Sequence, residues 1–292
     1  MKRHNFSHIF EINLAMVFIG TSGALGRYVE LPVPVTIACR GLLAFLLLYI
    51  FCKWKKISLN INRKDLPVII LSGLLMGLHW VTYFYALQLS NVAIGMLSLF
   101  TYPVITAFLE PLVLRTKLQW MHLLLGALVI SGIYFLAPNF DIKESNTIAI
   151  GIGVFSAFCY ALRNLVLKSQ VKKYHGSMLM VYQVAIVGMA LLPFVFYTDI
   201  TIVLGQWKGL LVLALLTTAI GHTLFLMTFK HFSITTVSIL SSIQPVYGIV
   251  IGIIFLGEIP DLRTVFGGIL ILASVVIESF RVTRKPKLTV PD

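Results

Sequence analysis

Two histidines, each inside a long apolar segment, are the residues of this sequence best suited to do chemistry. His79 lies just past the middle of segment 66–88, and His222 lies in segment 207–229. An imidazole can donate or accept a hydrogen bond and can carry a proton near neutral pH. Tyr83 follows His79 by four residues and therefore shares its helix face. We predict that all three side chains line a polar pathway. The alternative is that each imidazole bonds a buried carbonyl group.

Two further side chains join the predicted substrate-binding set: Arg163 and Tyr102. Ionisable groups are costly inside an apolar segment, so Arg163 is a functional candidate. Its planar guanidinium suits a carboxylate or a phosphate. The alternative is that it extends toward the end of its helix, near Lys168. Tyr102 could stack on a flat ligand, although buried aromatic side chains usually pack against their neighbours.

Three other charged side chains are expected to be structural. Arg40 is expected to be a partner for the end of a helix. Glu110 could exchange protons, but a pair with Arg115 on the same helix is the favoured interpretation. Glu258 follows a glycine at the end of an apolar segment, where a structural role is expected.

The composition excludes several classes of protein. Of the 292 residues, 58% are apolar and 12% are charged, which is too little polar surface for a soluble protein. Cys39, Cys52 and Cys159 show no metal-ligand spacing, so neither a metal nor another cofactor is predicted. The net charge of +12 is distributed over alternate loops. This pattern follows the positive-inside rule and argues against nucleic acid as a partner.

Ten apolar segments are long enough to cross a lipid bilayer as helices, which takes about 20 residues each. The period-two alternation of a membrane barrel is absent. Basic residues such as Lys55 and Lys172 follow the even-numbered segments, which places both termini in the cytoplasm. We predict an all-α polytopic membrane protein. The ten predicted helices are residues 9–28, 33–52, 66–88, 92–114, 119–137, 147–168, 177–197, 207–229, 233–256 and 262–280.

The second half of the chain repeats the first. Pro103 recurs as Pro245, and His79 recurs as His222 once a single-residue gap is allowed. We predict two repeats of five helices, the first over residues 9–137 and the second over residues 147–280. Because five is odd, the second repeat enters the membrane from the opposite side, so the repeats are inverted. Pro103 and Pro245 lie about halfway along their segments, where we expect kinks that act as hinges.

Several motifs together resemble a known family. Ser233-Ile-Thr-Thr-Val-Ser begins a stretch that continues to Leu256-Gly-Glu and then Gly267-Gly-Ile-Leu, and the first half contains Arg40-Gly-Leu-Leu-Ala and Phe84-Tyr-Ala-Leu. With its two five-helix halves, the chain resembles the EamA family of the drug/metabolite transporter superfamily. It departs from the family at Leu114-Arg-Thr-Lys, where the family often has a Gly-Glu pair.

The resemblance implies a function and a location for the binding site. Members of this family export amino acids or other small metabolites across the inner membrane, often coupled to a proton gradient. The resemblance also implies a central cavity between the first, third, fourth, sixth, eighth and ninth helices. The five predicted substrate-binding residues named above lie on those helices, and so does Gln244, which is the sixth predicted residue.

We therefore predict a secondary transporter that exports a small molecule by alternating access, with protons as the candidate coupling ion. Flipping of a lipid or lipid-linked sugar is the alternative. A membrane-embedded serine hydrolase is a third hypothesis, because Gly20-Thr-Ser-Gly places Ser22 in a nucleophile-like motif and His222 could act as its base. An inverted repeat has no use in that mechanism, so no enzymatic activity is predicted.

Overall fold

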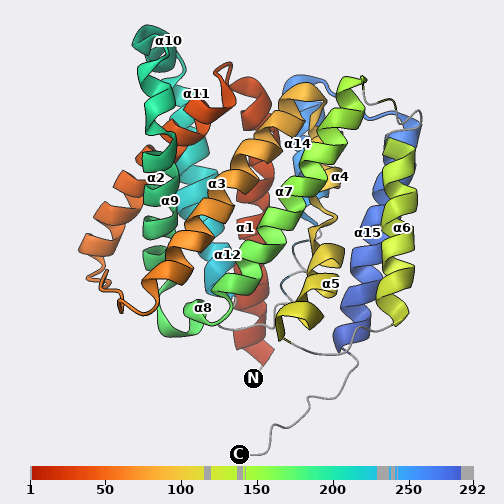
Figure 1. The fold of residues 1–292 in the computed structure, drawn as a ribbon, viewed down its shortest axis with the longest axis horizontal. Coiled ribbons are helices and arrows are strands. Elements are labelled where there is room, and N and C mark those ends of the chain that lie inside the picture. The colour runs from red at the N-terminus through yellow and green to blue at the C-terminus, as the bar shows by residue number, and fades with distance from the viewer. Residues whose placement is uncertain are drawn as a thin grey trace, which may run out of the picture.

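A computed structural model describes residues 2–114, 120–136, 141, 143–228, 237, 241 and 243–283. In this part of the chain every regular element is a helix (Figure 1). The elements are α1 (Lys2–Tyr28), α2 (Val33–Trp54), α3 (Leu66–Leu89), α4 (Val92–Leu99), α5 (Tyr102–Leu114), α6 (Trp120–Leu136), α7 (Ser145–Leu167), α8 (Gln170–Lys173), α9 (Gly176–Phe196), α10 (Ile200–Gly205), α11 (Trp207–Val212), the π-helix η1 (Leu213–His222), α12 (Thr223–Thr228), α14 (Gln244–Leu256) and α15 (Leu262–Thr283). Arg115 and most of the motif that begins at Ser233 lie outside the described residues.

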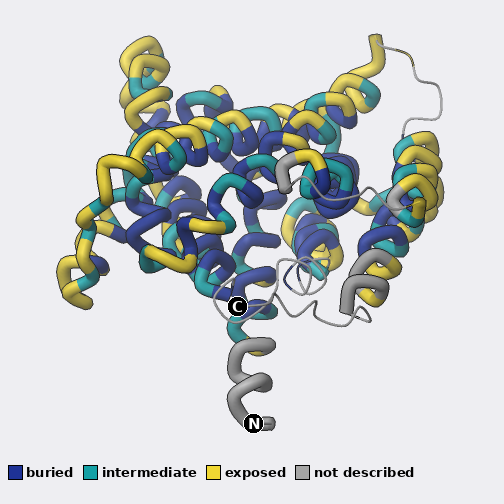
Figure 2. The backbone as a smooth tube through the Cα atoms, turned by 60° about the horizontal axis from the view of Figure 1, so that its bottom comes forward, coloured by how far each residue is buried: buried dark blue, intermediate teal, exposed yellow. Residues whose placement is uncertain are grey.

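The helices have the length and surface of membrane spans. Six helical stretches of the described chain, α2, α3, α7 and α9 among them, are long and apolar enough to cross a bilayer. The predicted fourth span consists of α4 and α5, and the eighth of α11, η1 and α12. Buried residues lie inside the bundle and exposed ones on its outer surface (Figure 2). Large apolar side chains such as Leu112 and Phe255 are exposed there, as a lipid-facing surface requires. The protein is an all-α polytopic membrane protein.

Side-chain caps and a glycine determine where several helices begin and end. Asn91 accepts a hydrogen bond from the Ile94 backbone N–H at 2.9 Å, which satisfies one of the free donors at the start of α4. Asp261 accepts a hydrogen bond from the Thr264 backbone N–H at 2.7 Å before α15. Gly257, with a φ of 68°, ends α14 in the left-handed conformation that glycine adopts without steric cost.

The two prolines do not kink continuous helices. Pro103 lies in the first turn of α5, after a break at Phe100 and Thr101 that separates α5 from α4. Pro245 likewise lies in the first turn of α14. Proline fits the first helical turn because the N–H it lacks has no partner there. The predicted mid-helix kinks are thus helix starts, and the hinge role of both prolines remains a prediction.

Helix packing follows the symmetry of an inverted repeat. Two contacts join equivalent spans of the two halves: α2 packs on α9, and α6 packs on α15. The other main contacts occur as related pairs. Helix α7 packs on α3, α4 and α5, while α1, its equivalent in the first half, packs on η1 and α14. The start of α1 and the end of α15 lie at the same end of the bundle, which we call the terminus-side face (Figure 1).

Glycine pairs allow the closest helix contacts. Between α6 and α15, a Cβ atom on Gly267 would lie 2.7 Å from the Gly132 carbonyl oxygen. Between α2 and α9, a Cβ atom on Gly41 would lie 3.1 Å from the Gly188 backbone nitrogen. Such close backbone approach is the usual way to pack helices in lipid, where apolar burial gives little driving force.

Candidate functional site

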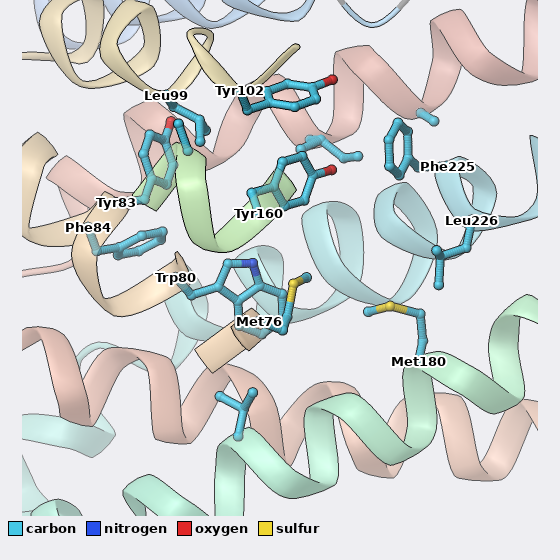
Figure 3. Close-up of a cluster of buried hydrophobic side chains, with 14 of the residues drawn as sticks. Met76, Trp80, Tyr83, Phe84, Leu99, Tyr102, Tyr160, Met180, Phe225 and Leu226 are labelled. Carbon is cyan, nitrogen blue, oxygen red and sulfur yellow. The ribbon is translucent and has the colours of Figure 1, made fainter. Parts of the chain in front are cut away.

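A small polar cavity lies inside the bundle, between the two repeats. Its volume is about 20 Å³, which is room for one or two water molecules. Its wall combines the helices that the family resemblance implies with one more, α2. Figure 3 shows aromatic side chains from α3, α5 and α7 gathered in this part of the interior. Five of the six predicted substrate-binding residues line the cavity: His79, Tyr83, Tyr102, His222 and Gln244.

His79 is held by α7 in a defined orientation. Its Nδ1 lies 2.8 Å from the Ser156 hydroxyl, and that hydroxyl donates to the His79 carbonyl oxygen, also at 2.8 Å. A hydroxyl has one hydrogen, so Nδ1 must be the donor to Ser156, and Nε2 of the neutral ring is then an acceptor. The imidazole also lies against Tyr160, with ring centroids 4.5 Å apart. The side chain is therefore positioned by protein contacts that leave Nε2 available.

His222 reaches the same cavity from the other repeat. It is the last residue of η1, a π-helix of ten residues. Such helices are rare, and single π-turns occur often at functional sites. The ring of His222 lies 5.6 Å from that of Trp80, and its buried Nδ1 makes no hydrogen bond. The two histidines related by the sequence repeat thus line one space from opposite halves of the protein.

Arg40 is the cavity residue that the sequence analysis assigned to a structural role. Its side chain is 1% exposed. Nε donates to the Thr218 hydroxyl at 2.7 Å, and Nη2 donates to the Thr217 hydroxyl at 2.9 Å. The guanidinium lies over the ring of Trp80, 4.0 Å from its centroid, which is the geometry of a cation–π contact. Arg40 therefore contacts η1, in the middle of a neighbouring span, and not the end of a helix.

Two buried donors in the cavity wall have no partner. Trp80 Nε1 makes no hydrogen bond, and the Tyr83 hydroxyl makes none of good geometry although Ser22 lies in the same wall. The Tyr102 hydroxyl, in contrast, lies 2.8 Å from the Ser241 hydroxyl. Unsatisfied buried polar groups cost free energy, so they mark sites where a ligand or water belongs.

Arg163 lies outside the wall of this cavity. Its Nε and Nη2 donate to the Gln183 side-chain oxygen at 2.9 and 2.7 Å. Its Nη1 donates to the Asn164 side-chain oxygen at 3.0 Å. The side chain is fully buried, so it does not extend to the surface near Lys168. It joins α7 to α9, and its guanidinium lies 6.0 Å from the centroid of the Tyr160 ring, which does line the cavity.

Three ion pairs of the described residues connect the repeats, one at the face opposite the termini and two at the terminus-side face, where one of the two joins Lys173 Nζ to Asp65 Oδ1 at 2.9 Å. At the face opposite the termini, Arg27 Nε lies 2.9 Å from Glu258 Oε1. Glu258 Oε2 also accepts the Val92 backbone N–H at 2.7 Å. At the terminus-side face, Lys168 Nζ lies 2.8 Å from Glu110 Oε1. This pair joins two helices, and the predicted pair of Glu110 with Arg115 stays a prediction because Arg115 lies outside the described residues.

An all-helical membrane bundle of two inverted repeats around a buried polar cavity is the architecture of a secondary transporter. The sequence profile of the EamA-like transporter family matches residues 7–137 and 147–280. The chain belongs to this family, within the drug/metabolite transporter superfamily, and is a multi-pass membrane transporter. It is therefore not an enzyme, although Ser22 and His222 of the hydrolase hypothesis both line the cavity.

Proteins similar to this chain are transporters from bacteria and archaea. The pseudopaline exporter CntI of Pseudomonas aeruginosa is 23% identical over 248 residues, covering 84% of this chain and 86% of the exporter. An uncharacterized transporter of Archaeoglobus fulgidus is 27% identical over 268 residues, covering 91% of this chain and 94% of its own length. A protein of known crystal structure superposes with a TM-score of 0.69 at 13% identity, covering 96% of this chain and 99% of that chain, which shows a shared fold.

Proposed function

We propose that this transporter exports a small metabolite, such as an amino acid, by alternating access around the central cavity. The observation that carries the proposal is the convergence of His79 and His222, one from each repeat, on a cavity with unsatisfied polar groups. The similarity to a protein named as an exporter supports the direction of transport. In this proposal the substrate is bound by His79, Tyr83, Tyr102, His222 and Gln244.

Two of the ion pairs between the repeats support the alternating part of the proposal. Arg27–Glu258 and Lys168–Glu110 each join one repeat to the other, at opposite faces. With both pairs formed, the cavity holds only one or two water molecules, so a metabolite requires one face to open. We propose that each pair closes its own face and that they break in turn.

We also propose that both termini are cytoplasmic and that protons are the coupling ion. Glu110 and Glu258 are both engaged in ion pairs, and the imidazoles of His79 and His222 are the proton carriers we favour. For the orientation, a cysteine replacing Asp141 is expected to react with an impermeant thiol reagent added outside cells, and one replacing Lys172 only after the membrane is opened. The reverse pattern would contradict the orientation.

The experiment that tests export compares the metabolites in the medium of cells with and without the protein. A compound that accumulates outside only with the intact protein identifies the substrate. Tyr83→Phe removes one cavity hydroxyl and is expected to lower export about threefold to tenfold, the effect of one hydrogen bond. Tyr85→Phe is the matched control, because Tyr85 lies on the same helix and is exposed on the bundle surface. Unchanged medium across a broad panel, or equal effects of the two variants, would contradict the proposal.

Movement of a lipid is a second candidate function that one observation favours. A largely apolar cavity of about 690 Å³ lies between α2, α9, η1 and α12. Lys55 and His175 line it at the helix ends of the terminus-side face. Two hydroxyls in its wall, those of Ser177 and Thr223, make no hydrogen bond. A headgroup-labelled phospholipid in proteoliposomes tests this candidate: transfer between leaflets would favour it, and transfer no faster than in protein-free liposomes would exclude it for that lipid.

A further inference from the structure

The cavity carries a positive charge that no carboxylate of the described chain neutralises. Arg40 lines the cavity, and its polar partners are the neutral hydroxyls of Thr217 and Thr218. No ion pair joins Arg40 to an acidic residue in the part of the chain that the structure describes. Burying an unpaired charge in a low-dielectric interior costs several kcal/mol, so a compensating anion would be strongly favoured there.

Hydrogen-bonding capacity at the same place is unbalanced toward donors. A guanidinium has five N–H groups, and Nη1 of Arg40 makes no hydrogen bond with a described residue. Trp80 Nε1 can only donate, and it is buried without a partner. The Tyr83 hydroxyl adds a third available donor. Three groups that share one small cavity and lack acceptors match a ligand that supplies several acceptor atoms at once.

A second arginine increases the positive potential near the cavity. Arg163 is also fully buried, and its polar partners are the amide oxygens of Gln183 and Asn164. These partners occupy its Nε, Nη1 and Nη2, so Arg163 has less capacity than Arg40 to bind a ligand directly. Its charge still favours an anion beside Tyr160, since charges interact over several ångströms in a low-dielectric interior.

We propose that the transported metabolite carries an anionic group and that Arg40 binds this carboxylate or phosphate, with Trp80 Nε1 and the Tyr83 hydroxyl as further donors. The inference rests on the proposed transport function and adds the chemical class of the substrate. Arg40 also links this anion to η1, because Thr217 and Thr218 are its other partners. Carboxylate and phosphate share the same recognition chemistry here, so the test must separate them.

The test measures thermal unfolding of the purified full-length protein with matched ligands at constant ionic strength. The probes are succinate, its neutral diamide, and inorganic phosphate, with sodium chloride as the reference. We expect succinate or phosphate, but not the diamide, to raise the unfolding temperature. Stabilisation by succinate alone would identify a carboxylate site, and stabilisation by phosphate alone a phosphate site.

Three variants decide whether Arg40 is responsible. Arg40→Gln is expected to lower the affinity for the stabilising anion about tenfold or more, because a charge-assisted hydrogen bond is lost. Arg40→Lys should keep part of it, because the charge remains. Lys64→Gln, an exposed cation near the start of α3, is the control and should leave it unchanged. If Arg40→Gln does not fold, the comparison of succinate with the diamide on the wild-type protein still decides between an anionic and a neutral ligand.

Several outcomes would overturn the proposal. They are equal stabilisation by succinate and its diamide, no stabilisation by either anion, or an anion effect that survives Arg40→Gln. The charge of the compound found in the medium comparison is an independent check. An exported compound that carries no carboxylate or phosphate group overturns the anion proposal and leaves the proposed export function intact. A medium without any exported compound instead counts against export itself.

Discussion

Removing the charge of Glu258 should open the face of the protein opposite the termini. Its carboxylate holds two partners there, Arg27 Nε at 2.9 Å and the Val92 backbone N–H at 2.7 Å. Both side chains of the ion pair are partly exposed, 32% for Arg27 and 19% for Glu258, so water weakens their attraction. Such a pair contributes up to about 1 kcal/mol. A carboxylate at the start of α4 contributes about 1 kcal/mol more.

Glu258→Gln keeps the shape of the side chain and removes its charge. The closed face should become less stable by about 1–2 kcal/mol, which raises the population of the open state about fivefold to thirtyfold. The assay is the labelling rate of Ser22→Cys, a residue of the cavity wall, by an impermeant thiol reagent applied to that face. The three native cysteines are first replaced: Cys39, Cys52 and Cys159.

The matched control is Glu110→Gln, which removes the equivalent pair at the terminus-side face. It should lower the labelling rate from the opposite face, because it favours the state that is open on the terminus side. A charge exchange, Arg27→Glu with Glu258→Arg, should restore slow labelling in part, since the ion pair returns and the bond to Val92 does not. An unchanged labelling rate in Glu258→Gln, or the same change in both single variants, would refute the gating role of these pairs.

Two further predictions concern stability. Gly267→Ala places a Cβ atom 2.7 Å from the Gly132 carbonyl oxygen, so α6 and α15 must separate. The free energy of unfolding should therefore fall by about 1–3 kcal/mol. An unfolding temperature equal to that of the wild type would refute this contact. Hydrogen bonds from Lys173 and then Tyr174 hold the pKa of the Asp65 carboxyl below its usual value. The contribution of the Asp65 carboxylate to stability is therefore present above the usual carboxyl pKa and is lost as the pH falls through the lowered value. Asp65→Asn should destabilise the protein near pH 7 and have little effect in strong acid. Thermal unfolding of both proteins at a series of pH values measures this difference.

The sequence by itself determined the architecture. A bilayer demands long apolar helices whose backbone groups bond internally, so the spans can be read from composition and length. The odd repeat marked by Pro103 and Pro245 implied inverted halves. Its histidines, His79 and His222, were correctly expected to lie in equivalent spans. These features are visible because each depends on one segment, or on a comparison of two segments.

Only the tertiary structure decided which arginine lines the cavity. Arg40 and Arg163 are both single charges within apolar spans, and no pattern along the chain ranks them as the structure does. The direction of a side chain depends on how its helix is rotated about its axis, and that rotation is fixed by packing. In α2, Gly41 faces α9 because it packs closely against Gly188, and the adjacent Arg40 contacts η1.

The helix break before Pro103 and the partner of Glu110 were decided in the same way. Sequence spacing suggested a kink within one helix, and it did not indicate that Glu110 contacts a residue of the other repeat. The structure has two helices, α4 and α5, and a pair between Glu110 and Lys168 of the other repeat. The π-helix that presents His222 was also beyond the sequence, because no local preference specifies a bond from residue i to residue i+5. Contacts between distant segments choose among such local alternatives, and a linear pattern does not contain those contacts.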